Sequence, residues 1–148
     1  MSRVGADWAE AARAWIGTPY VHQASLRGAG CDCLGLVRGL WREIWPDKPL
    51  AVPAYTPDWA EPARIEALWQ AAAALLCEKP VAMRAPGDVI LFRMRAGSVA
   101  KHLGIMGRAG AAPSFIHAYS GHGVIESPLS APWARRIVAC FAFPQETM

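Results

Sequence analysis

Apolar residues recur at helical spacing in the first half of the chain and form short blocks in the second half. Between residues 8 and 45 they fall three or four positions apart, which predicts two amphipathic helices, over about 8–16 and 33–45. Residues 18–31 hold a proline, two glycines and no apolar period, so we expect a loop there. A third helix is expected over 59–77. Its inward-facing residues are Ile65, Leu68, Trp69, Ala72, Leu75 and Leu76.

Polar residues, glycines and prolines mark where these helices begin and end. Asp7 is expected to cap the first helix, and Gly17 and Pro19 to end it. Asp32 occupies the position that an N-cap residue takes before the second helix, and Pro46 follows its last apolar residue. The boundaries of the second helix are therefore defined at both ends, with Cys33 in its first turn.

After residue 88 the apolar positions form short blocks rich in β-branched and aromatic residues, separated by glycine and proline. The blocks predict five strands, over 89–92, 102–106, 114–119, 123–127 and 136–143. Helices followed by strands are typical of the α+β class, so we expect N-terminal helices packed on an antiparallel sheet. The 148 residues show no internal repeat, which predicts one domain spanning 1–148.

Composition and charge narrow the function classes. With 53% hydrophobic residues and seven tryptophans, the chain is typical of a packed globule. Its net charge of +3 is spread over scattered basic residues, so we expect no nucleic-acid partner. No apolar stretch approaches the roughly 18 residues of a membrane span. The first residues lack the apolar core of a signal peptide, which predicts synthesis in the cytoplasm without Sec-type export.

Cys33 is the strongest candidate for a reactive group. The free N–H groups and the dipole at a helix start favour a negative charge, so we expect a lowered pKa for the Cys33 thiol. A thiol nucleophile also needs a base, and the base needs a partner that orients it. His102 and His117 lie on neighbouring predicted strands, where antiparallel pairing can bring the two side chains together.

Cys31 admits several interpretations. Its separation from Cys33 by one residue does not suit a zinc knuckle, and Cys77 and Cys140 fall in an apolar helix and an apolar strand. A disulfide between Cys31 and Cys33 would close a small strained ring that could mask the nucleophile. We favour a reduced thiol without a chemical role, and we expect neither a metal nor a cofactor.

Five segments resemble one known family. They read "WIGTPYV" at 15–21, "DCLGLV" at 32–37, "APGDVILF" at 85–92, "HLGI" at 102–105 and "FIHA" at 115–118. In this order they resemble the motifs of the NlpC-type cell-wall cysteine peptidases, which have a papain-like fold. The resemblance extends over roughly residues 8–143 and implies a papain-like α+β fold for this chain.

The resemblance also implies a role for each matching residue. Cys33 would be the nucleophile, His102 the general base and His117 the residue that holds the His102 ring. The Cys33 backbone N–H and the Tyr20 hydroxyl would stabilise the oxyanion. Enzymes of this family cut amide bonds in peptidoglycan stem peptides, often between γ-linked D-glutamate and the diamino acid.

The segment "GCDCLGLVRGLW" at 30–41 resembles the branch found among phage and gene-transfer-agent tail genes. This implies tail-tip or baseplate hub proteins as partners, and action in the periplasm of a target cell. Leu34 replaces the usual serine, Gln23-Ala24 stands where many members have two glycines, and the connection at 107–114 is long. Two alternatives remain open. One is a structural tail-tip component with vestigial catalytic residues, and the other is an amidase or acyltransferase on the same fold, since one fold can host several acyl-transfer chemistries.

Overall fold

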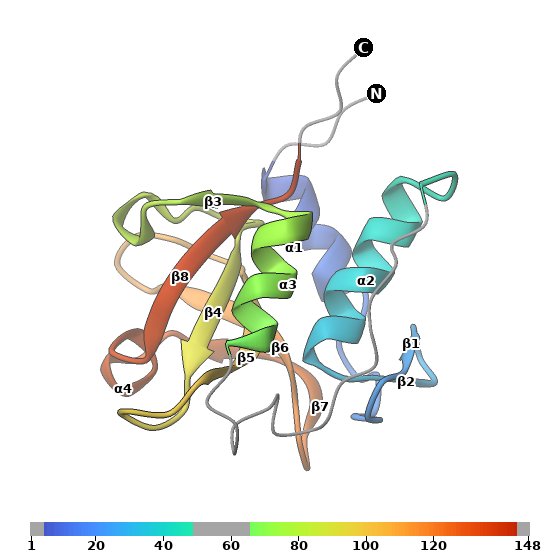
Figure 1. The fold of residues 1–148 in the computed structure, drawn as a ribbon. Helices are drawn as coiled ribbons and strands as arrows, with labels where there is room; N and C mark the ends of the chain where they lie inside the picture. Colours follow the sequence, from blue (N-terminus) through green and yellow to red (C-terminus); the bar gives the residue numbers. More distant parts are fainter. Residues whose placement is uncertain (1–4, 49–65, 145–148) are drawn as a thin grey trace.

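The computed structural model describes residues 5–48 and 66–144, which form helices and short strands in the order shown in Figure 1. In chain order the elements are α1 (Gly5–Arg13), β1 (Ser25–Leu26), β2 (Gly30–Cys31), α2 (Cys33–Ile44), α3 (Ala67–Leu75), β3 (Cys77–Lys79), a 3₁₀ helix (Val81–Met83), β4 (Val89–Arg93), β5 (Ala100–Met106), β6 (Ser114–Tyr119), β7 (Gly123–Pro128), α4 (Ala131–Ala134) and β8 (Ile137–Ala142). None of the helices in the described ranges has the length and apolar character needed to cross a bilayer.

The main sheet has six strands in the order β3-β8-β4-β5-β6-β7, and each neighbouring pair is antiparallel. Helices α1, α2 and α3 lie together beside this sheet (Figure 1). The predicted α+β class, with helices packed on an antiparallel sheet, is therefore confirmed. All five strands predicted from the apolar blocks are present, with bounds within two residues of those expected.

The side chains of the sheet divide between two apolar clusters because successive residues of a strand face opposite sides. Along β4, Val89 and Leu91 belong to the larger cluster with the helices. Ile90 and Phe92 belong to a smaller cluster on the other side of the sheet, against which Trp133 of α4 packs. The helices therefore cover one side of the sheet, and α4 partly covers the other.

The second helix begins and ends as predicted, whereas the first does not. Helix α2 covers Cys33–Ile44 with Asp32 as its N-cap. Helix α1 begins at Gly5, so Asp7 lies inside its first turn and the predicted cap is wrong. It also ends at Arg13, and Ile16 beyond it is 46% exposed. Gly17 follows with a positive φ of 95°, which suits the end of the turn.

The third helix ends two residues before its predicted end at residue 77. Helix α3 covers Ala67–Leu75, and residues 59–65 lie outside the described part of the chain. Cys77 pairs with Ala142 in the edge strand β3 and is exposed, so its expected place in an apolar helix is wrong. The expected loop at 18–31 also contains the small β1-β2 sheet. Neither β3 nor β1 carries an apolar pattern, so only pairing with a partner strand defines them as strands.

Candidate active site

The carboxylate of Asp32 holds the start of α2 against the preceding loop. Its Oδ1 accepts a hydrogen bond from the Gly35 N–H at 2.7 Å, and its Oδ2 accepts one from the Gln23 N–H at 2.7 Å. The loop approaches the helix so closely that a Cβ on Gly35 would lie 1.9 Å from the Ala24 carbonyl oxygen. The expected cap is therefore confirmed, and the same carboxylate fixes the loop that precedes Cys33.

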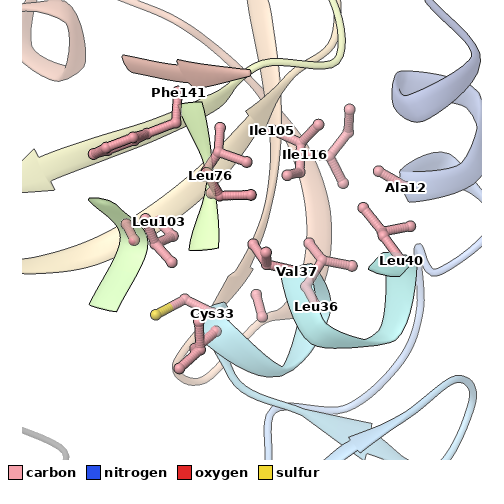
Figure 2. Close-up of a cluster of buried hydrophobic side chains, with 14 of the residues drawn as sticks. Ala12, Cys33, Leu36, Val37, Leu40, Leu76, Leu103, Ile105, Ile116 and Phe141 are labelled. Carbon is pink, nitrogen blue, oxygen red and sulfur yellow. The ribbon is translucent and has the colours of Figure 1, made fainter. Parts of the chain in front are cut away.

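The Cys33 side chain is 5% exposed and lies at the first turn of α2, near Leu103 (Figure 2). The backbone N–H groups of Cys33, Leu34 and Leu103 point to the sulfur and favour the thiolate. Burial outweighs them and, together with the negative charge of Asp32, raises the pKa of the Cys33 thiol to about 12. The predicted lowering of this pKa by the helix dipole is therefore wrong for this structure, in which the thiol is neutral.

His102 and His117 form a buried imidazole pair. His102 Nε2 lies 2.8 Å from His117 Nδ1, and the two side chains are 7% and 1% exposed. Burial, with His117 as a second cause, lowers the pKa of His102 to about 3. Burial, with His122 as a second cause, lowers the pKa of His117 to about 4. Both imidazoles are therefore neutral near pH 7, and one can accept a proton.

The imidazole pair links β5 and β6 by a side-chain hydrogen bond. The backbone pairing of these strands comprises Ile105 with Ile116 and Met106 with Phe115. Nearer the start of β5, the hydrogen bond between His102 and His117 joins the strands instead. The Cys33 sulfur lies against the N–H of Leu103, the residue after His102. Cys33 and Leu103 belong to the larger cluster on the helix side of the sheet, whereas His102 is paired with Phe92 and packs with Trp133 on the other side.

Tyr20 also lies within electrostatic reach of the thiol. Its backbone forms an isolated parallel bridge with Cys31, and its side chain is half-buried. Burial, followed by the charge that a Cys33 thiolate would carry, raises the pKa of Tyr20 to about 12. The phenol therefore keeps its proton and can donate a hydrogen bond. His22, on the same loop, has its Nδ1 3.7 Å from Asp32 Oδ2 and is exposed.

The structure adds two residues that the sequence interpretation missed. Ser127 Oγ lies 2.9 Å from His117 Nε2. Trp133 is half-buried, and its ring centroid lies 5.8 Å from that of His102 and 5.4 Å from that of His117. The alternation of residues along β7 predicts the side of the strand on which Ser127 lies. It does not predict that Ser127 meets His117, because that contact depends on the register of β6 with β7.

The remaining cysteines are free thiols in this structure. Cys31 is fully buried, and burial raises the pKa of its thiol to about 12. Cys140 is also buried, and its Sγ lies 3.8 Å from Asp88 Oδ2. Within the described ranges, no group of three or more His, Cys, Asp or Glu side chains is arranged to hold a metal ion.

Comparison with solved structures identifies the fold. The NlpC/p60 domain of the peptidoglycan hydrolase SagA superposes with a TM-score of 0.64 at 19% identity, over 95% of this chain and 100% of that one. The fold is that of the NlpC/P60 domains. An NlpC/P60 family protein from Bacillus cereus gives a TM-score of 0.65 at 15% identity. NlpC2 from Trichomonas vaginalis gives 0.63 at 21% identity over 94% of this chain.

Several of these NlpC/P60 structures are longer than this chain. The chain spans 39% of a Staphylococcus aureus NLP/P60 family protein, 40% of the Bacillus cereus protein and 46% of NlpC2. No family model and no curated protein matches the sequence. At identities of 15–21%, the four structures establish the papain-like NlpC/P60 fold and leave the activity to be argued from the site.

Proposed function

We propose that this chain is a cysteine peptidase that hydrolyses amide bonds in peptidoglycan stem peptides. The observations that carry the proposal are the Cys33 thiol at a helix start, where it interacts with the backbone N–H of Leu103 next to His102, and the hydrogen bond between His102 and His117. A nucleophile, a base and a partner for the base are the groups that acyl transfer requires. The NlpC/P60 fold supports the substrate class, since solved structures with this fold include a peptidoglycan hydrolase and Ly7917 with the hydrolysing product of MDP.

In the proposed reaction, the Cys33 sulfur attacks the carbonyl carbon while its proton passes to His102 Nδ1. The thiol starts neutral, so proton transfer accompanies the attack rather than preceding it. The backbone N–H of Cys33 and the hydroxyl of Tyr20 stabilise the oxyanion. The C–N bond then breaks, and His102 gives its proton to the leaving amine. Water, activated by His102, hydrolyses the thioester and restores the thiol.

The bond cleaved and the setting are finer proposals. We propose the γ-D-glutamyl bond to the diamino acid as the target, and a phage-like or gene-transfer-agent tail as the assembly that carries the enzyme into the periplasm of a target cell. The bond is supported by the resemblance of the motifs at 32–37 and 102–105 to the NlpC-type family, and the setting by the resemblance of the segment at 30–41 to the tail-associated branch. Mass analysis of released muropeptides identifies the bond, and separates hydrolysis from acyl transfer. Mass spectrometry of purified tail particles tests the location.

The deciding experiment is digestion of purified sacculi. Wild type should release new muropeptides and Cys33→Ala should release none, because the nucleophile is missing. Cys31→Ala is the matched control, since Cys31 is a buried free thiol two residues away. It should retain activity if it folds, which thermal unfolding checks. Identical digests from wild type and Cys33→Ala would refute the enzyme proposal.

One observation favours a second candidate, a structural tail-tip component with vestigial catalytic residues. The Cys33 thiol is 5% exposed and burial raises its pKa to about 12, so it is not ionised in this structure. A structural component would be inactive on sacculi yet present in purified tails. Sacculus digestion and tail composition together therefore separate the two candidates.

A further inference from the structure

His117 has a hydrogen-bond partner at each of its ring nitrogens. Nδ1 lies 2.8 Å from His102 Nε2, and Nε2 lies 2.9 Å from Ser127 Oγ. Ser127 belongs to β7, where it pairs with Phe115. Directly paired residues point to the same side of a sheet, so Ser127 lies on the same side as Phe115. Residues two apart in a strand also share a side, so His117 lies on this side too. A hydrogen-bonded series thus runs from β5 through β6 to β7 and ends at a hydroxyl.

We infer that Ser127 is a positioning residue, whose oxygen accepts the His117 Nε2–H and thereby leaves His102 Nδ1 free to receive the Cys33 proton. The inference deepens the proposed function and rests on it. Each neutral imidazole carries one N–H, so the series has two possible directions. The direction decides whether His102 presents a lone pair or an N–H on its Nδ1.

In the first direction, His102 Nε2–H donates to His117 Nδ1, and His117 Nε2–H donates to Ser127 Oγ. His102 Nδ1 then carries a lone pair and acts as a base. In the second direction, Ser127 donates to His117 Nε2, His117 Nδ1–H donates to His102 Nε2, and His102 Nδ1 is already protonated. Only the first direction permits transfer of the thiol proton to His102.

The charged state formed during the reaction requires the same direction. When His102 takes the thiol proton, both of its nitrogens carry hydrogens. Its Nε2–H must then face an acceptor, which is the lone pair of His117 Nδ1. In the second direction two N–H groups would face each other across the 2.8 Å contact. An acceptor at His117 Nε2 is thus needed throughout, and a hydroxyl oxygen supplies it.

The surroundings of His117 make the hydroxyl hard to replace. Three aromatic rings pack around the imidazole, with centroids 4.1 Å away for Phe115, 5.3 Å for Tyr119 and 5.4 Å for Trp133. His117 is 1% exposed, so water has little access to Nε2. Without Ser127 Oγ, the Nε2–H of His117 would be buried without its acceptor, which costs more than the bond itself contributes. The proton would then favour Nδ1, the direction in which His102 is not a base.

The test combines ¹⁵N NMR of the imidazole nitrogens with kinetics. In wild type, His102 and His117 should both carry their protons on Nε2. Ser127→Ala should move the His117 proton toward Nδ1 and lower kcat about tenfold with KM unchanged, as loss of one hydrogen bond predicts. Ser127→Thr keeps the hydroxyl on a residue that suits a strand, and should restore both values. Ser130→Ala, at an exposed serine before α4, is the matched control and should change neither.

The outcomes separate this inference from the proposed function. A wild-type His117 protonated on Nδ1 would overturn the inference without any variant. So would a folded Ser127→Ala protein that keeps the wild-type tautomers and kcat. A role in stability alone would lower the melting temperature of Ser127→Ala and leave both readouts unchanged, which also overturns it. If wild type releases no muropeptides, the proposed function fails, and the tautomers still decide whether Ser127 directs the series.

Discussion

Acidification should destabilise the protein well above the pH at which carboxylates titrate, because the fold buries two neutral imidazoles. Burial lowers the pKa of His102 from 6.5 to about 3 and that of His117 from 6.5 to about 4. In the unfolded chain both take up protons as the pH falls through 6.5, whereas in the folded chain neither does until below about pH 4. The unfolded state binds more protons in this window, so stability falls as the pH falls.

The magnitude follows from the width of the window. Each group lowers the free energy of unfolding by about 1.4 kcal/mol per pH unit once the pH is below 6.5. Between pH 7 and pH 5 this amounts to about 2 kcal/mol for each histidine, or roughly 4 kcal/mol for the pair. The ion pair of Glu126 with Arg13 lowers the pKa of Glu126 below its usual 4.5, so its contribution is lost at lower pH, outside this window.

Urea unfolding followed by tryptophan fluorescence at pH 7, 6, 5.5 and 5 measures this loss. His117→Gln should roughly halve the slope, because its amide can replace the hydrogen bonds of the ring but cannot titrate. His122→Gln, at an exposed histidine, should keep the wild-type slope. A wild-type free energy of unfolding that changes by less than about 1 kcal/mol from pH 7 to pH 5 would refute the buried neutral pair.

Three further predictions concern the loop, the oxyanion and the base. Gly35→Ala should lower the free energy of unfolding by about 1–3 kcal/mol in urea titrations, since its Cβ would meet the Ala24 carbonyl oxygen at 1.9 Å; unchanged stability would contradict the close packing of the loop. Tyr20→Phe should lower kcat on muropeptides about 10²-fold if its hydroxyl joins the Cys33 N–H at the oxyanion, and unchanged kcat would exclude that role. Because burial lowers the pKa of His102 to about 3, the acid limb of kcat/KM should lie well below pH 6.5, and a limb near 6.5 would indicate a solvated base.

The sequence alone determined the elements that depend on local signals. The N-cap at Asp32, the apolar face that follows and Pro46 define α2, since each acts within one helix turn. The five apolar blocks after residue 88 define the strands β4, β5, β6, β7 and β8, because the alternation of apolar residues is also a local signal. The short helix α4, between β7 and β8, was not predicted from the sequence. These two sets of elements were enough to predict the α+β class and to identify Cys33, His102 and His117 as candidate catalytic residues.

Only the tertiary structure decided which of these residues meet and how they are charged. The register of β6 with β7 brings Ser127 to His117, and no local pattern specifies that register. The helix start favours a Cys33 thiolate, yet the depth of burial reverses the direction of the pKa shift. Likewise, β3 forms a strand because its backbone pairs with that of β8. Strand register, burial and edge pairing arise from contacts between segments far apart in the chain. The sequence therefore identified the candidate reactive groups, whereas packing determined their protonation states.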